Sequence, residues 1–172
     1  LTQTGLQMAM ASPQIHNLYN AYRKMYEALG IKDIDRILPP PPPTAPKDPS
    51  LEHIDALGGK QFQAFPGQDH RAHVTAHLNF MSTNLVRNNP NVMAAIQKNI
   101  LEHISLMATE QVQLEYREQM MQLQQLAQQA AVNPQAQQQM QEMTQNIEAR
   151  KAVLIAEMTG DFMKEEKEIT SQ

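Results

Sequence analysis

The fold is decided by a stretch that begins with Asn89-Pro90-Asn91-Val92-Met93, restarts with Asn133-Pro134-Gln135-Ala136 and ends at Gly160. Each start contains an Asn-Pro pair, Asn89-Pro90 or Asn133-Pro134. The Asn can cap free backbone N–H groups, and the Pro suits the first helical position, where no hydrogen-bond donor is needed. No Gly or Pro interrupts Pro90 to Val132, which predicts one helix of roughly 60 Å. The second pair predicts a helix from Pro134 to Thr159 that folds back on the first as an antiparallel hairpin.

Apolar side chains step by three or four residues along both predicted helices, as expected for one buried helical face. They are Met93, Ile96, Ile100, Ile104 and Met107 in the first helix and Met140, Met143, Ile147, Leu154 and Met158 in the second. Twelve glutamines lie between Gln119 and Gln145. Such a tract could be disordered, but the apolar spacing and the helix propensity of Gln, Ala and Met favour helix. We expect this thin hairpin to pack against the rest of the chain or against copies of itself.

Composition points to one extended domain. The 172 residues are 41% hydrophobic and 5% aromatic with no Trp, which leaves little bulk for a large globular core. The absence of Cys excludes disulfides, thiolate metal sites and Cys nucleophiles. The longest apolar run is far short of the ~20 residues that a membrane helix needs, so no membrane partner is expected. Because the chain opens without a Met or a leader, we expect it to be an internal piece of a longer polypeptide.

Charge is uneven along the chain. Residues 1–89 carry eight Lys and Arg against seven Asp and Glu, whereas residues 90–172 carry six against eleven, so the net charge of −4 comes from the hairpin half. Tight binding of nucleic acid depends on neutralising several phosphates, which this surface does not favour. The chain could lie near DNA without holding it.

An N-terminal segment, residues 1–38, contains one amphipathic helix. Ser12-Pro13 predicts its start and Gly30 its end. Its apolar face comprises Ile15, Leu18, Tyr22, Met25 and Leu29. A short helical turn is expected between Ile31 and Leu38.

A proline-rich segment, residues 39–68, follows. Its prolines, Pro39 to Pro43, Pro46 and Pro49, favour polyproline II, either as a rigid strap between packed elements or as an SH3-type ligand; the strap is preferred. Asp48-Pro49 starts a short helix in which Leu51, Ile54 and Leu57 are apolar and which Gly58-Gly59 closes. A loop to Gln68 has Phe62 and Phe65 as expected anchors.

The third segment, residues 69–132, opens with the chemically suggestive cluster Asp69-His70-Arg71-Ala72-His73-Val74-Thr75-Ala76-His77. Its helix is predicted from Gln68-Asp69 to about Asn88. The three histidines fall within about 60° of one another, and His73 and His77 have the i, i+4 spacing that can bind zinc. The residues Val74, Leu78, Met81 and Leu85 form an apolar stripe beside them.

The preferred interpretation of His70, His73, His77 and His103 is structural, with ring nitrogens bonded to carbonyls or to Asp and Glu on a packed neighbour. His103 is the candidate partner across the helix pair. Metal binding is the alternative, with Asp69 and His103 as the nearest further ligands but without motif spacing, and catalysis is a third. No HExxH, nucleophile elbow or phosphate-binding loop occurs, so neither an enzyme nor a cofactor is expected. Residues 133–172 form the fourth segment, with a frayed end after Gly160.

Two runs in this sequence resemble the C-terminal part of portal proteins from tailed bacteriophages. They are Phe65 to Met81, which reads Phe-Pro-Gly-Gln-Asp-His-Arg-Ala-His-Val-Thr-Ala-His-Leu-Asn-Phe-Met, and Ile100 to Ala108, which reads Ile-Leu-Glu-His-Ile-Ser-Leu-Met-Ala. Tyr26 to Leu38 is similar as well. Together these runs cover about residues 15–110.

The resemblance implies a structural segment of a ring of twelve subunits at one capsid vertex, assembled in the host cytoplasm and carried in the virion. Double-stranded DNA would enter and leave through its channel without sequence-specific binding. The implied partners are copies of the chain, the major capsid protein, the packaging terminase and the tail adaptor. No catalytic residue carries over, since the portal is not the ATPase. The alternative is a stand-alone coiled-coil scaffold or adaptor.

Overall fold

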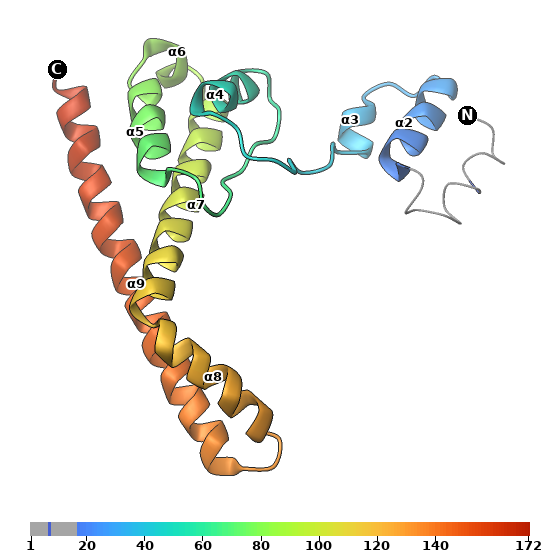
Figure 1. The fold of residues 1–172 in the computed structure, drawn as a ribbon. Coiled ribbons are helices and arrows are strands. Elements are labelled where there is room, and N and C mark those ends of the chain that lie inside the picture. The colour runs from blue at the N-terminus through green and yellow to red at the C-terminus, as the bar shows by residue number, and fades with distance from the viewer. Residues whose placement is uncertain (1–6, 8–16) are drawn as a thin grey trace. The chain divides into compact units, whose positions relative to one another are not determined.

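The computed structural model describes residue 7 and residues 17–172, which form eight helices, α2 to α9, and no strand (Figure 1). The all-α prediction is therefore confirmed for the described residues. The chain divides into two compact units, residues 1–43 and residues 44–172. The four-segment division expected from the sequence is a finer one and stays a prediction.

The first unit contains α2 (Leu18–Ala28) and α3 (Ile34–Ile37). The side chain of Asn17 caps α2 by accepting a hydrogen bond from the backbone N–H of Asn20 at 3.0 Å. Gly30 follows the helix with a φ of 69°, as the left-handed position after a helix end requires. Both helices are confirmed, although the predicted start at Ser12-Pro13 lies outside the described residues. No regular secondary structure is assigned to residues 39–47, so the strap itself remains a prediction.

Helix α4 (Pro49–Leu57) opens the second unit, and its Asp48 cap accepts from the N–H of Ser50 at 2.9 Å. The helix forms where expected, but it does not bury its apolar side chains. Leu51, Ile54 and Leu57 are 50%, 63% and 44% exposed, whereas Glu52 and Asp55 are buried with Ala56. The polar face of α4 points inward because it packs on α5 and α7, where histidines of α5 contact Glu52 and His53.

The helix predicted from Gln68-Asp69 to about Asn88 is instead two helices, α5 (His70–Met81) and α6 (Asn84–Arg87). At the break the hydroxyls of Ser82 and Thr83 donate to the carbonyls of Asn79 and Phe80, each at 2.7 Å. Such local bonds compete with the helical ladder. As a consequence Val86 is fully buried, and Leu85, which was expected on the apolar stripe, is 58% exposed.

The first arm of the hairpin is also broken, into α7 (Pro90–Glu115) and α8 (Arg117–Gln129). The break is at Tyr116, whose backbone (φ −111°, ψ 23°) leaves the helical region without any Gly or Pro. The Tyr116 side chain packs against the cluster of Ala108, Val112, Ile147 and Leu154. We attribute the bend to this packing. It keeps α8 in contact with α9, while α7 packs on both α9 and α5.

The second arm, α9 (Pro134–Thr170), runs ten residues past the predicted end at Gly160. Phe162, 4% exposed, is buried in the core beyond that glycine, and Ile169 packs against the same core. This burial outweighs the weak helix propensity of glycine, which is about 1 kcal/mol below that of alanine. The expected frayed end is therefore helical, and Glu165 accepts a hydrogen bond from the Thr75 hydroxyl at 2.8 Å.

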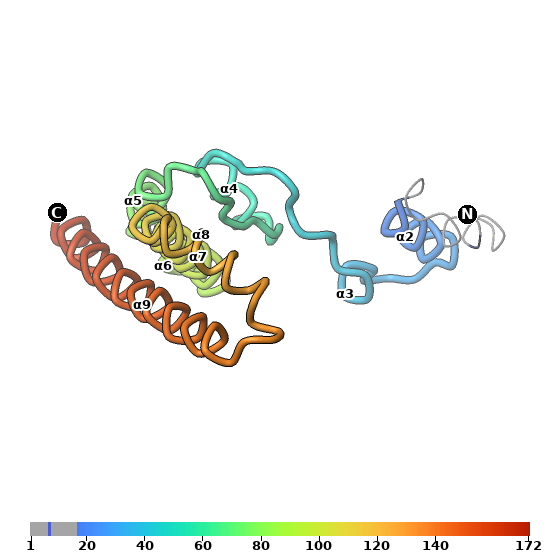
Figure 2. The backbone as a smooth tube through the Cα atoms, turned by 60° about the horizontal axis from the view of Figure 1, so that its bottom comes forward, coloured from blue at the N-terminus to red at the C-terminus, as the bar shows by residue number. Residues whose placement is uncertain are grey.

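Both Asn-Pro starts are confirmed, because the Asn89 and Asn133 side chains accept from the N–H groups of Val92 and Ala136, respectively, within hydrogen-bond distance. A turn at residues 130–133 reverses the chain, so that α9 runs antiparallel to α8 and then passes α7 (Figures 1 and 2). The predicted apolar stripes form the interior. The larger core cluster contains Val74, Leu78, Met81, Val86, Val92, Ile96, Ile100, Ile104 and Phe162, with Ala56 at its edge.

Candidate functional site

The candidate site is a buried cluster of histidine and glutamate side chains where α4, α5 and α7 meet. Glu52 comes from α4, His73 and His77 come from successive turns of α5, and His103 comes from α7. Their exposed fractions are 0%, 6%, 0% and 0%, respectively. One ligand-type atom from each of the four lies within 4.8 Å of the others. We call these four residues the buried cluster.

Glu52 joins the two α5 histidines. Its Oε2 atom lies 3.1 Å from Nδ1 of His73 and 3.2 Å from Nε2 of His77. The second carboxylate oxygen, Oε1, is buried without a hydrogen-bond partner. A buried carboxylate normally needs all its lone pairs satisfied, so this oxygen marks an incomplete polar site.

His103 is linked to the protein surface through His70. The two Nδ1 atoms lie 2.9 Å apart, and Nε2 of His70 lies 3.1 Å from Oε1 of Glu110. Glu110 also accepts the backbone N–H of Gly67 at 2.7 Å. Nε2 of His103 is the second buried atom of the cluster without a hydrogen-bond partner.

His77 has partners on both ring nitrogens. Nε2 lies 2.8 Å from Oδ1 of Asn99, and Nδ1 lies 2.9 Å from Nε2 of His53. The His53 ring stacks on Phe80 with a centroid distance of 4.0 Å. These contacts fix the orientation of the His77 ring.

Two histidines at the site, His103 and His53, have pKa values below the ordinary value of a histidine. Burial, and then the neighbouring rings of His73 and His77, lower the pKa of His103 to about 3. Burial, and then His77, lower the pKa of His53 to about 4. The N–H of Gly67, and then the hydrogen bond with His70, lower the pKa of Glu110. At neutral pH His103 and His53 are therefore uncharged and Glu110 is ionised.

Of the sequence candidates, His73, His77 and His103 are brought together, and His70 adjoins them through His103. The expected contact of the α5 histidines with His103 is observed, and so are bonds to Glu side chains on packed neighbours. Asp69 is outside the cluster, since it caps α5 by accepting the N–H of Ala72 at 3.1 Å.

Sequence reasoning missed Glu52, Asn99 and Glu110. Asn99 and Glu110 lie on α7 with His103, and their spacing gives no recognisable motif. Glu52 lies on the polar face of α4, opposite Leu51, Ile54 and Leu57. The amphipathic pattern of the helix assigns this polar face to solvent. No signal within α4 itself reverses that assignment.

Imidazole nitrogens with a carboxylate oxygen are suitable ligands for a divalent transition metal. They are also the residue types of acid–base catalysis, which needs access for a substrate. The cluster lies within the packed helices α4, α5 and α7, and its four side chains are almost entirely hidden from solvent. The arrangement therefore favours a structural role, with or without a metal ion, over catalysis.

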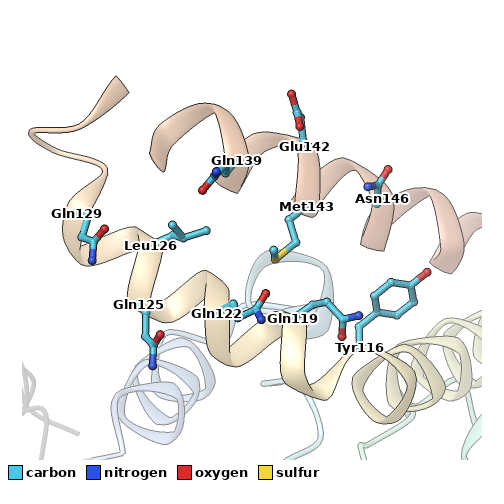
Figure 3. Close-up of a pocket in the computed structure, with 10 residues that line it drawn as sticks. All are labelled: Tyr116, Gln119, Gln122, Gln125, Leu126, Gln129, Gln139, Glu142, Met143 and Asn146. Atoms are coloured by element: carbon cyan, nitrogen blue, oxygen red, sulfur yellow. The ribbon is translucent and has the colours of Figure 1, made fainter. Parts of the chain in front are cut away.

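Hollows also lie elsewhere on the second unit, away from the buried cluster. Figure 3 shows the larger, about 660 Å³, between α8 and α9, lined chiefly by the amides of Gln119, Gln122, Gln125, Gln129, Gln139 and Asn146. The smaller, about 290 Å³, lies among α5, α7 and α9 and is mostly apolar. Neither is lined by a histidine or by a nucleophile next to a base.

Within the described residues, no helix has both the length and the apolar character needed to span a membrane. No protein-family model, curated protein or solved structure matches this chain.

Proposed function

We propose that this chain is a structural segment of a tailed-bacteriophage portal, the ring at one capsid vertex through which DNA is packaged and ejected. The sequence runs that carry the resemblance, Phe65 to Met81 and Ile100 to Ala108, supply α5 and the middle of α7. These elements pack on each other around the buried cluster. In this proposal the chain has no enzymatic role, its location is the virion, and its partners are capsid protein, terminase, tail adaptor and passing DNA.

The observation that carries the proposal is the reversed orientation of α4. Leu51, Ile54 and Leu57 are about half exposed on one face of a nine-residue helix whose opposite face is buried. Contiguous exposed apolar side chains normally mark an interface. We define these three residues as the α4 ridge, and the occupant we propose for it is a second copy of this chain.

A second apolar surface lies on another side of α7. It is the smaller hollow, in which Leu101 and Met163 are 59% and 56% exposed beside Ile100, Ile104 and Phe162. At 100° per residue, Leu101 is turned about 200° from His103, which lies beside Glu52 of α4 in the buried cluster. The ridge and this hollow therefore belong to different faces of the unit.

Two different complementary faces produce a head-to-tail contact, which closes into a ring when the rotation between subunits allows it. In the proposed ring the α4 ridge of one copy packs into the hollow of the next. The net negative charge and the amide-rich end of the hairpin suit a surface that DNA passes without being held.

The alternative function is a stand-alone coiled-coil scaffold. It is favoured by the long pairing of α8 and α9, with Met and Leu side chains between them. A scaffold predicts a dimer or trimer joined along the hairpin, and it leaves the α4 ridge without a function.

The test is the mass of the full-length protein in solution, combined with electron-microscopy class averages viewed down the assembly axis. We expect rings of about twelve subunits. The double variant Leu51→Asp, Ile54→Asp should abolish rings while circular dichroism stays helical. Val132→Asp, at an 88% exposed position in the hairpin turn, is the matched control and should assemble normally. A stable dimer or trimer without rings would contradict the portal proposal, and rings formed by the double variant would contradict the ridge as their interface.

A further inference from the structure

We propose that Glu52, His73, His77 and His103 together bind one Zn²⁺ ion, which ties α4 to α5 and α7. This inference does not depend on the portal proposal, because it concerns the interior of one chain. It assigns to the buried cluster a ligand and a function beyond that of polar packing.

The first argument is geometric. Four ligands about 2.0–2.2 Å from a tetrahedral zinc ion are separated from one another by roughly 3.3–3.6 Å. Oε2 of Glu52 already lies 3.1 Å from His73 and 3.2 Å from His77, and the four ligand atoms all lie within 4.8 Å of one another. Binding would require the longest of these separations, up to 4.8 Å, to shorten to roughly 3.3–3.6 Å. His73 and His77 are also one helical turn apart, which places both rings on one side of α5.

The second argument is the protonation state of His103. Oε1 of Glu110 already accepts the N–H of Gly67 and lies 3.1 Å from Nε2 of His70, which assigns the donor N–H to that nitrogen. A His70 ring with one N–H then offers Nδ1 as an acceptor. His103 must then donate its Nδ1–H to His70 across 2.9 Å. In a neutral ring this leaves a bare lone pair on Nε2, the atom that is buried without a donor. A metal ion is the partner that such a nitrogen lacks.

The third argument is that both unpartnered buried atoms belong to the same four residues. Among the described side chains these atoms are Oε1 of Glu52 and Nε2 of His103. Buried polar atoms are rarely left without partners, and each costs roughly 1–3 kcal/mol of desolvation when it is. Two of them in one cluster are better explained by one missing ligand than by two separate defects.

Neighbouring groups hold the ligands in the way that metal sites require. Metal-bound histidines usually donate their second N–H to a fixed acceptor, which sets the tautomer. His103 donates Nδ1–H to His70. Without an ion, Nε2–H of His77 faces two acceptors, Oδ1 of Asn99 at 2.8 Å and Oε2 of Glu52 at 3.2 Å. A metal ion would replace that proton, and Nδ1 of His77 would then donate to Nε2 of His53 at 2.9 Å.

The choice of Zn²⁺ follows from ligand type, number and burial. Imidazole and carboxylate ligands suit zinc, and four protein ligands leave no coordination position for water. A closed, buried site of this kind is structural rather than catalytic. The ion would also explain why α4 turns its polar face inward, since coordination by Glu52 anchors the helix in that orientation.

The first experiment measures zinc in protein purified without chelators. We expect about one zinc per chain, and in chelator-treated protein a rise of the melting temperature when Zn²⁺ is added back. Glu52→Gln and His103→Gln should lower zinc affinity by more than 100-fold. His53→Gln, next to a ligand, should lower it by roughly 10–100-fold. Asp69→Asn is the matched control, because it keeps the α5 cap near the cluster and should bind zinc like the wild type.

The second experiment avoids variants that fail to fold. Zinc-edge X-ray absorption of the wild-type protein should give four nitrogen or oxygen ligands at about 2.0–2.1 Å with imidazole scattering. Folded wild-type protein that neither contains stoichiometric zinc nor gains thermal stability from added Zn²⁺ would overturn the proposal. Six oxygen ligands in the absorption spectrum, or undiminished binding by both Glu52→Gln and His103→Gln, would overturn it as well.

Discussion

Nδ1 of His103 lies 2.9 Å from Nδ1 of His70, although 33 residues separate them in sequence. One of two facing ring nitrogens must donate and the other accept, so the tautomers of the two histidines are coupled. Glu110, 3.1 Å from Nε2 of His70, decides which one donates. A partly exposed carboxylate thus determines the state of a fully buried imidazole.

Changing Glu110 to Ala should release this coupling. Oε1 of Glu110 accepts the N–H of Gly67 and faces Nε2 of His70, so its loss leaves Nε2 of His70 without the acceptor that holds its proton and allows the protons of His70 and His103 to exchange between tautomers. Nitrogen-15 shifts of the histidine rings should record the exchange, and the free energy of unfolding should fall by about 1–3 kcal/mol. Glu118→Gln, an exposed substitution on α8, is the control. Unchanged ring shifts in the Glu110 variant would show that this carboxylate does not set the tautomers.

Ile96→Ala should produce one of the largest losses of stability. Ile96 is 0% exposed in the larger core cluster, so truncation leaves a cavity among packed aliphatic side chains. We expect a loss of about 2–5 kcal/mol in urea unfolding. Leu101→Ala on the same helix, at a 59% exposed position, should cost within about 0.5 kcal/mol when measured on monomeric chain. Similar losses for the two variants would contradict the assignment of the buried α7 face.

Gly160→Ala distinguishes a helix interior from a helix end. Gly160 lies inside α9, and a Cβ atom added there meets no atom within 4 Å. Alanine should therefore raise the free energy of unfolding by about 0.5–1 kcal/mol. Gly59→Ala is the opposite case, because its φ of 69° disfavours any side chain, and it should destabilise the protein. Destabilisation by Gly160→Ala would instead place a helix end at that residue.

The ion pair between Glu115 and Arg150 should make stability depend on pH in the acid range. Arg150 donates from Nε and Nη2 to the carboxylate at 2.9 and 3.1 Å, and this bond, followed by one from Gln111, lowers the pKa of Glu115 from 4.5 to about 2. A lowered carboxyl pKa contributes stability above the unfolded-state pKa and loses it as pH falls through the folded-state pKa.

Thermal unfolding of wild type and Glu115→Gln across pH checks this expectation. The difference between their midpoints should be full above pH 4.5 and shrink towards pH 2. Because the pair is solvent-exposed, the difference should be small and should also shrink in high salt. Glu118→Gln again serves as control. A difference that stayed constant from neutral pH to pH 2 would exclude the pair as its source.

Local sequence determined where most helices begin. Asn89-Pro90, Asn133-Pro134 and Asp48-Pro49 act through hydrogen bonds that span two or three residues, so they can be recognised without knowledge of the fold. The apolar stripe of α7 was equally evident, since a helical face is fixed by spacing alone. The α5 histidines were identified as a cluster for the same reason.

Tertiary structure decided what local spacing cannot encode. Contacts between distant segments turn the polar face of α4 inward, bend the chain at Tyr116 and continue α9 past Gly160. These contacts outweigh the helix propensities of single residues, which differ by only about 1 kcal/mol. The meeting of Glu52 with His103 is of the same kind. They are 51 positions apart in the sequence, and only the packing of α4, α5 and α7 brings their side chains into one buried site.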